Sequence, residues 1–526
     1  MNWQVSAKVS GGHRFSTATE EEYQATARAL DDQSAALERV ALQWSQAAFD
    51  IDRLRISPAT CAEYDAAAAA LGVAAGPHAA MSFDLLVSQA GEHASICREL
   101  AVQMETMAEL LARAHELYGH AEEQASRAAN ETFQLLGSFS PSTLLFTLAG
   151  QLTGGALTGL IREGRFSQWW LADATKDMQE GSLAAIAAAL SLHSRPLSNI
   201  GRTDEANHAA SMLAPMMAER AKRRQGDALL VREVRPRVPV TGHAGSVSEA
   251  LVGLQRLSDV SYGVSNLDSG LAYGTIAIQK YRREDGSTSW LVTIPGTDGN
   301  PDSPFGWPQN IELMSDRTEI RRRADSARLV AQAMREAGIR SDEPVALIGH
   351  SQGGIVAATI ASDWADDYDI QHVVTAGSPV ANHPIPSKTW VTSIEVDDEL
   401  VAATDGAPNP ATPNWLTVRG TSSLAPSTGG AASSGAAAAG IGAAGIDASA
   451  KPFEAAPVAG AGKPKESSHY LRYHQAAYQH ASDLGSRETV THERHFQKVV
   501  GGELVETKYY EGRMSKDSSK TTQRKP

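Results

Sequence analysis

The pattern of apolar and polar residues changes along the chain. In about the first 120 residues, apolar side chains recur at steps of three, four and seven, the spacing of one helix face. From about residue 270, short apolar runs and strict alternation predict β-strands, with helical patterns between them. Strands that alternate with helices predict an α/β fold with a mostly parallel sheet, here preceded by a helical N-terminal region.

The N-terminal region, residues 1–130, predicts two long helices that serve interaction or secretion. Breaks at Pro58 and at Gly72–Pro77 separate two apolar seams, so the helices are expected to fold back as an antiparallel pair. The first seam consists of Tyr23, Ala27, Leu30, Leu37, Ala41, Trp44 and Ala48, and the second of Leu86, Ala90, Cys97, Leu100, Met104, Met107, Leu111, Ala114 and Tyr118.

The middle region, residues 131–235, continues the helical pattern and contains an uncharged segment, Phe133–Ile161. This segment is long enough to cross a bilayer, but its serine, threonine and glutamine residues favour a buried or interface-seeking hairpin. Contact with a membrane surface stays an open alternative at this point.

Residues 236–490 predict the α/β domain. Within it, apolar and polar residues alternate in two runs, Tyr273–Tyr281 and Ser289–Ile294, with the turn sequence Asp285-Gly286 between them. This pattern predicts a β-hairpin. Further strands are predicted at Val345–Ile348, His372–Thr375 and Val391–Val396, and helices at Ile320–Ala337, Ile355–Ala365 and Tyr470–Ser482. Residues 405–466, rich in Ala, Gly, Ser, Thr and Pro, predict a disordered insertion, and residues 491–526 predict a hairpin turning at Gly501-Gly502 and a frayed tail.

Composition and charge exclude several classes of protein. The formal net charge of −14 has the wrong sign for a protein that binds a phosphate backbone, so no nucleic-acid partner is expected. Cys61 and Cys97 are the only two cysteines, too few for a disulfide framework or a cysteine zinc site. The first 19 residues lack the apolar core of a Sec signal peptide, which predicts a cytoplasmic protein unless another export route exists.

Gly349-His-Ser-Gln-Gly353 is the motif that carries chemistry. It follows an apolar strand and precedes an apolar helix, the context of the Gly-x-Ser-x-Gly turn that presents a nucleophile. In so sharp a turn the central residue is strained and its neighbours must lack a Cβ atom. We therefore predict that Ser351 is a catalytic nucleophile at the carboxyl edge of the sheet.

A nucleophilic serine needs a base and an orienting acid, which follow it in the order Ser, Asp/Glu, His. The strand ending at Val396 is followed by Asp397 and Asp398; we expect Asp398 to be the acid, with Asp397 as the alternate. His469, at the loop-to-helix transition after the insertion, is the expected base, and His474 is its rival.

The oxyanion formed during attack needs two amide donors. The N–H of Gln352, the residue after the nucleophile, is one candidate. The other is expected in the loop that follows the Trp290–Ile294 strand, where Gly296 permits a close approach and Thr297 offers its N–H and hydroxyl.

With these motifs, residues 270–480 resemble an α/β-hydrolase, most closely the class 3 lipases. The resemblance rests on Pro295-Gly296-Thr297, on Gly-His-Ser-x-Gly-Gly at Gly349–Gly354, and on Gly377-Ser-Pro379. It implies a serine esterase acting on acylglycerols, phospholipids or similar esters, with no metal or organic cofactor.

A second resemblance concerns Tyr118-Gly-His-Ala-Glu122, a Tyr-x-x-x-Glu after the helical pair. It resembles the signal of WXG-type substrates of type VII secretion. This implies export by that machinery, and the alternative is a helical interaction domain that remains in the cell.

Overall fold

The structure is a computed structural model that describes residues 3–12, 17–55, 70, 83–117, 168–175, 179–180, 182–183, 186–187, 204–425, 455–462 and 464–516. The described residues form two compact units, a helical pair between residues 15 and 117 and a larger unit built on a β-sheet. Phe133–Ile161, Tyr118 and Glu122 lie outside the described residues. Among the described helices, none combines the length and hydropathy that crossing a membrane requires.

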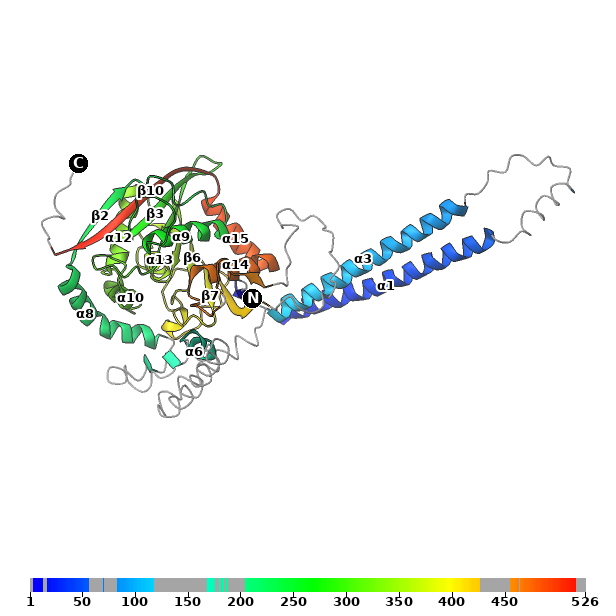
Figure 1. The fold of residues 1–526 in the computed structure, drawn as a ribbon, viewed down its shortest axis with the longest axis horizontal. Helices are drawn as coiled ribbons and strands as arrows, with labels where there is room; N and C mark the ends of the chain where they lie inside the picture. Colours follow the sequence, from blue (N-terminus) through cyan, green and yellow to red (C-terminus); the bar gives the residue numbers. More distant parts are fainter. Residues whose placement is uncertain are drawn as a thin grey trace. The chain divides into compact units, whose positions relative to one another are not determined.

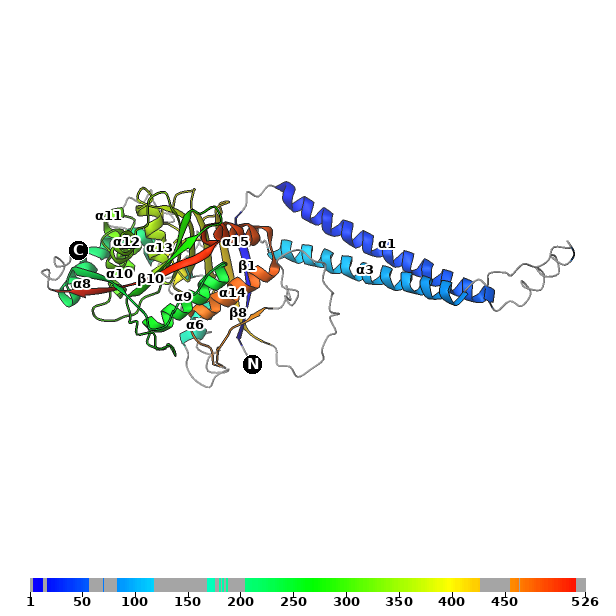
Figure 2. The same cartoon turned by 90° about the horizontal axis from the view of Figure 1, so that it is seen from above.

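The helical unit consists of α1 (Thr17–Arg55) and α3 (Phe83–Leu117), which lie side by side in Figures 1 and 2. Two hydrogen bonds show that they are antiparallel. Ser34 of α1 donates to the carbonyl of Ala101, and Ser45, further along α1, accepts from Arg98, which is earlier on α3. The predicted antiparallel pair is therefore confirmed.

The seam of this pair matches the predicted one at Ala41 and Ala90 and differs from it at the larger residues. Small residues fill it, with Ala41, Ala90, Ala94 and Ala101 all buried. Small side chains let two helices approach closely, which pushes larger neighbours aside. Trp44, Leu100 and Met107, which were expected in the seam, are 39–47% exposed on its flank.

The larger unit is built on a ten-stranded sheet with the order β2-β10-β3-β4-β5-β6-β7-β8-β1-β9 in the described residues (Figure 1). Strands β4 to β8 are parallel to one another, and the strands that flank them pair antiparallel. In chain order the strands are β1 (Trp3–Gly11), β2 (Ala228–Val234), β3 (Thr275–Arg282), β4 (Thr288–Ile294), β5 (Pro344–His350), β6 (Asp369–Ala376), β7 (Trp390–Val396), β8 (Trp415–Leu424), β9 (Ala456–Pro457) and β10 (Glu503–Ser515).

Helices cover both faces of the sheet. One core joins α12 and α13 to residues such as Val345 and Leu347, and the other joins α9, α14 and α15 to the alternate positions Ala346 and Ile348. The apolar run of β5 is thus buried on both faces, as central parallel strands are. The helices of this unit are α6 (Gln168–Thr175), α8 (Glu205–Gln225), α9 (Val247–Ser261), α10 (Trp307–Leu313), α11 (Thr318–Arg321), α12 (Asp325–Ala337), α13 (Gln352–Asp363), α14 (Leu471–Leu484) and α15 (Arg487–Val500).

The predicted α/β-hydrolase architecture is confirmed, but three segments differ from expectation. Residues 3–11, expected within the helical region, form β1 inside the sheet. Residues 415–424, expected in the disordered insertion, form β8. The expected C-terminal hairpin is instead helix α15 followed by β10, because Phe496, Val499 and Val500 are buried at helical spacing.

Candidate active site

Ser351 forms the turn between β5 and α13. Its backbone has φ 54° and ψ −122°, a conformation that residues with a Cβ avoid. In the part of the chain that the structure describes, only Ser351 and Leu400 combine a side chain with positive φ. Such strain costs on the order of 1–3 kcal/mol and persists only where the surroundings impose it. Ser351 therefore stands at the carboxyl edge of the sheet, where the motif predicts it.

Three glycines make this turn possible. A Cβ atom on Gly349 would clash with the backbone of Gly353, and one on Gly353 would clash with the carbonyl of Ile294. A Cβ atom on Gly354 would clash with the hydroxyl of Ser378, which donates a hydrogen bond to the Ser351 carbonyl at 2.8 Å. The tight packing of β4, β5 and α13 thus fixes the serine on its turn.

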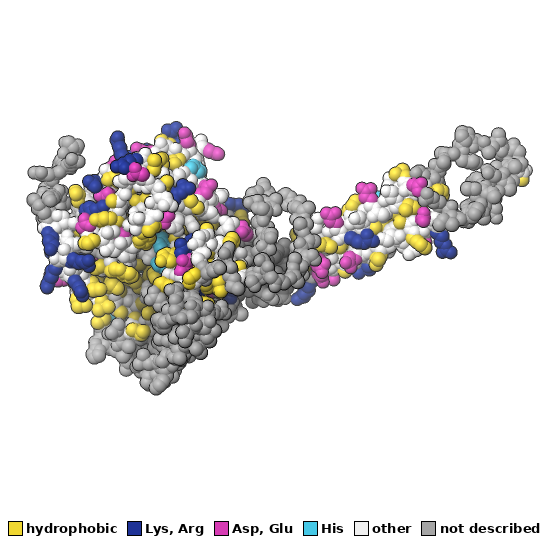
Figure 3. Space-filling view, in the orientation of Figure 1, with side chains coloured by type: hydrophobic (Ala, Val, Ile, Leu, Met, Phe, Trp, Pro, Cys, Tyr) yellow, Lys and Arg dark blue, Asp and Glu magenta, His cyan; other side chains and the backbone are white. Residues whose placement is uncertain are grey.

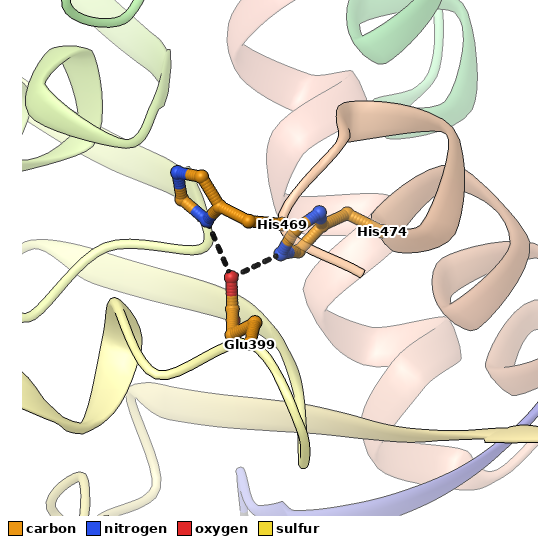
Figure 4. A group of neighbouring side chains, drawn as sticks. All are labelled: Glu399, His469 and His474. Carbon is orange, nitrogen blue, oxygen red and sulfur yellow. Dashed lines mark hydrogen bonds and ion pairs between the residues drawn. The ribbon is translucent and has the colours of Figure 1, made fainter. Parts of the chain in front are cut away.

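His469 reaches this edge from the loop before α14. Its Nδ1 lies 2.7 Å from Oε2 of Glu399 (Figure 4), and its side chain is mostly buried. Its carbonyl accepts a hydrogen bond of 2.8 Å from Nε2 of His350, the residue before the nucleophile. The rings of His350 and His469 are 4.8 Å apart, so the structure brings the predicted base next to the serine turn.

Glu399, and not Asp398, is the carboxylate that bonds this histidine. Strand β7 ends at Val396, and the following turn bends Glu399 back so that its Oε1 accepts the Val396 N–H at 3.0 Å. Its Oε2 accepts from His469 and lies 3.1 Å from Nε2 of His474. Glu399 is the third carboxylate in the run after β7, but the prediction considered only the two aspartates directly at the strand end.

The two aspartates that were expected to supply the acid have other partners. Asp398 forms a buried ion pair with Lys465, with Oδ2 and Nζ 2.7 Å apart. Asp397 accepts a hydrogen bond of 2.6 Å from the hydroxyl of Thr421 on β8. The structure therefore does not place either aspartate on His469, and His474 lies on Glu399 as a second histidine.

The charge of Glu399 depends on its neighbours. Burial alone would raise its pKa, but the His474 imidazole and hydrogen bonds from both histidines hold the pKa of this carboxyl well below its usual range. Burial, followed by repulsion from His469 and His474, lowers the pKa of His350 well below its usual value. His350 is thus neutral, and the site pairs an ionised acid with the histidine that faces it.

Two backbone segments border the serine where an oxyanion would form. Gln352 is the first residue of α13, and the first N–H groups of a helix have no partner within it. Its side chain is fixed by a hydrogen bond of 2.8 Å to the carbonyl of Gly306. A Cβ atom on Gly296 would lie 3.2 Å from Cβ of Ser351, which places the Gly296-Thr297 backbone against the nucleophile. The Thr297 hydroxyl accepts from Asn310 at 3.1 Å.

Glu399, His469 and His474 could also serve as metal ligands, since their donor atoms lie within 4.8 Å of one another. Their mutual distances of 2.7 and 3.1 Å are those of direct hydrogen bonds, and a metal would have to displace the protons between them. The arrangement fits proton chemistry as it stands.

Comparison with known proteins supports the fold. Residues 320–403 match the PGAP1-like alpha/beta domain family, an α/β-hydrolase-type family. This stretch includes Ser351 and Glu399 and ends before His469. It is a different family from the class 3 lipases suggested by the motifs. Searches of curated proteins and of solved structures gave no significant match.

Proposed function

We propose that this protein is a serine hydrolase that cleaves carboxylic esters, with lipid-like substrates. The proposal is carried by one observation: the strained serine turn lies beside a histidine whose Nδ1 is hydrogen-bonded to the buried Glu399 carboxyl. His469 accepts the Ser351 proton as the oxygen attacks the ester carbonyl, and the amides of Gln352 and Thr297 bind the oxyanion. The alkoxide leaves with that proton, and water then hydrolyses the acyl-enzyme by the same steps.

Exposed apolar side chains at the site support a lipid-like substrate. Tyr470 adjoins His469, Leu400 adjoins Glu399, and Trp307 follows Gly306, whose carbonyl holds Gln352; all three are exposed, with Trp307 at 72%. Hydrophobic side chains also gather over α8 (Figure 3), which packs on α10 and exposes Met212, Leu213 and Met216. Apolar surface of this kind suits an acyl chain better than a small polar ester.

A fluorophosphonate probe tests the proposal, because it labels only an activated serine. Labelling of the full chain that disappears in Ser351→Ala supports it, and absence of labelling in the wild type contradicts it. Short- and long-chain p-nitrophenyl esters, assayed beside acyl thioesters, then separate ester hydrolysis from a thioesterase or acyl-transfer role.

A second candidate function, association through the helical pair, is favoured by exposed apolar side chains on one face of the pair. On α1 this face carries Val40 and Trp44, and on α3 it carries Ile96, Leu100 and Met107, each 37–47% exposed. The Trp44 and His93 rings, 4.9 Å apart, place both stripes on the same side. On α3, Glu92 and Glu99 lie at the edge of this face, four residues before and three residues after Ile96.

We propose that a second copy of this face covers the first, since two antiparallel helices present a surface that can pack on itself. Light scattering of the full chain should give a dimer, and Val40→Glu with Leu100→Glu should give a monomer. Glu38→Gln with Glu105→Gln, two exposed positions on the far sides of the helices, is the control. A wild-type monomer at all concentrations removes this candidate.

Export by a type VII-like route remains a separate proposal that rests on Tyr118 and Glu122 in the sequence. Fractionation into medium, membrane and cytosol tests it, with Tyr118→Ala and Glu122→Ala expected to abolish export and retain the protein in the cell. Equal secretion of both variants and the wild type would remove the proposal.

A further inference from the structure

The acid of the site binds two histidines, and the proposed reaction uses only one of them. His474 lies on α14, and its side chain is fully buried. Its Nε2 is 3.1 Å from Oε2 of Glu399, the same oxygen that bonds Nδ1 of His469 at 2.7 Å (Figure 4). A Cβ atom on Gly377, at φ 59°, would lie within 3 Å of all three groups, so the backbone leaves room for this cluster.

Both ring nitrogens of His474 face hydrogen-bond acceptors. An ionised carboxylate and a carbonyl oxygen can only accept hydrogen bonds. Nε2 of His474 faces the Glu399 carboxylate, and Nδ1 lies 3.4 Å from the carbonyl of Tyr470. Both nitrogens therefore donate when the ring is protonated, and a cationic ring compensates the charge of a carboxylate that is removed from water.

The other ionisable groups around the cluster do not replace His474. His350, from β5, is neutral and bonds the His469 carbonyl. Glu395, from β7, carries the same sign as Glu399, and its carboxylate is paired with Arg419 at 2.8 Å. Within the described residues, His469 and His474 are thus the two side chains bonded to the Glu399 carboxylate.

We propose that His474 is a positioning residue that keeps Glu399 ionised and directs its carboxylate at His469. This inference rests on the proposed hydrolase function. His474 touches neither the serine nor a substrate in this arrangement; it acts through the acid. Its removal should therefore alter the rate and the pH dependence of serine activation and leave substrate binding unchanged.

The test measures the rate at which a fluorophosphonate labels Ser351 across a range of pH. His474→Phe removes the hydrogen-bond donor and the charge of this side chain. Its labelling rate at neutral pH should fall about 10-fold. The acid limb of its pH–rate profile, where labelling is lost as the pH falls, should move up by about one pH unit. His474→Gln restores an N–H donor without charge, so its alkaline rate should recover to within about threefold while the limb stays displaced.

His480→Asn is the matched control, because His480 is another buried histidine of α14 and bonds the Ala7 N–H instead of the site. It should keep the wild-type pH profile. A folded His474→Phe with wild-type rate and profile overturns the inference; if that variant does not fold, a wild-type acid limb in His474→Gln overturns it. An unlabelled wild-type Ser351 would instead overturn the hydrolase function on which the inference rests.

Discussion

Neighbouring carboxylates at the end of β7 have different partners, and this difference can be measured. Glu399 bonds His469, whereas Asp398 pairs with Lys465. Glu399→Gln keeps the shape but favours the wrong histidine tautomer, so kcat should fall about 10⁴-fold with an unchanged fold. Asp398→Asn should lower the free energy of unfolding, because it removes the carboxylate charge from the buried ion pair with Lys465, and kcat of the folded variant should stay within about 10-fold of wild type.

Ester hydrolysis and urea unfolding of the two variants decide the assignment. If Asp398→Asn abolishes turnover while Glu399→Gln remains active, the acid is the aspartate expected from the sequence, and the contact seen at Glu399 has no catalytic meaning.

Leu400 provides a second test at the residue scale. It has φ 63°, and the Val401 N–H donates across it to the Glu399 carbonyl at 2.8 Å, which makes a strained three-residue turn. Leu400→Gly should change the free energy of unfolding by less than about 1 kcal/mol, because relief of strain offsets the extra freedom of the unfolded chain. Leu400→Val should cost about 1–3 kcal/mol, since a β-branched residue tolerates this conformation poorly.

Urea unfolding measures both variants, with Leu267→Val as the control at an exposed leucine without positive φ. Equal stability of Leu400→Val and the wild type would show that the turn is not strained in solution.

At the scale of elements, a buried lysine joins the N-terminal strand to the site. Lys465, four residues before His469, pairs with Asp398 and lies 5.1 Å from the ring of Trp3 on β1 and 4.9 Å from that of Trp170 on α6. Lys465→Met should cost about 3–5 kcal/mol, because Asp398 is left charged and buried. It should also lower kcat, because the segment before His469 loses its anchor.

A double-mutant cycle measures this coupling by urea unfolding. Lys465→Met with Asp398→Asn should cost at least about 1 kcal/mol less than the two single changes added together. Arg237→Met is the matched control, since Arg237 pairs with Asp268 on the surface and its loss should cost less than about 1 kcal/mol. Additive costs in the cycle would contradict the buried pair.

The elements that the sequence predicted well are those with local signals. The β3-β4 hairpin has a turn sequence between two runs of alternating apolar and polar residues. The serine turn is marked by glycines on both sides of Ser351, and the close packing around them explains why they are needed. Glu399, the proposed acid, was missed because its position depends on where β7 ends and how the next turn bends. Strand β1 alternates Trp3, Val5, Ala7 and Val9 as a strand should, but its place beside β8 depends on pairing over more than 400 residues of sequence.

At the scale of the whole molecule, buried histidines make the stability of the sheet unit depend on pH. His372 on β6 lies 3.1 Å from His495 on α15, Nδ1 to Nδ1, and His492 bonds Thr392 of β7 at 3.3 Å. Burial is the main cause that lowers the pKa of His372 well below its usual value and the pKa of His492 and of His495 to about 4. All three therefore stay neutral in the folded chain at neutral pH.

In the unfolded chain these histidines bind protons below their ordinary pKa of 6.5, whereas in the folded chain His492 binds one only near pH 4. The free energy of unfolding should therefore be at its full value above pH 6.5 and should fall as the pH is lowered toward 4. His492 alone should account for about 3 kcal/mol of that loss.

Urea unfolding at a series of pH values tests this: His492→Gln should lose about 3 kcal/mol less on acidification than the wild type. His243→Gln, at an exposed histidine, should keep the wild-type slope. If His492→Gln also keeps that slope, the acid sensitivity of the sheet unit does not arise where α15 packs on β6 and β7.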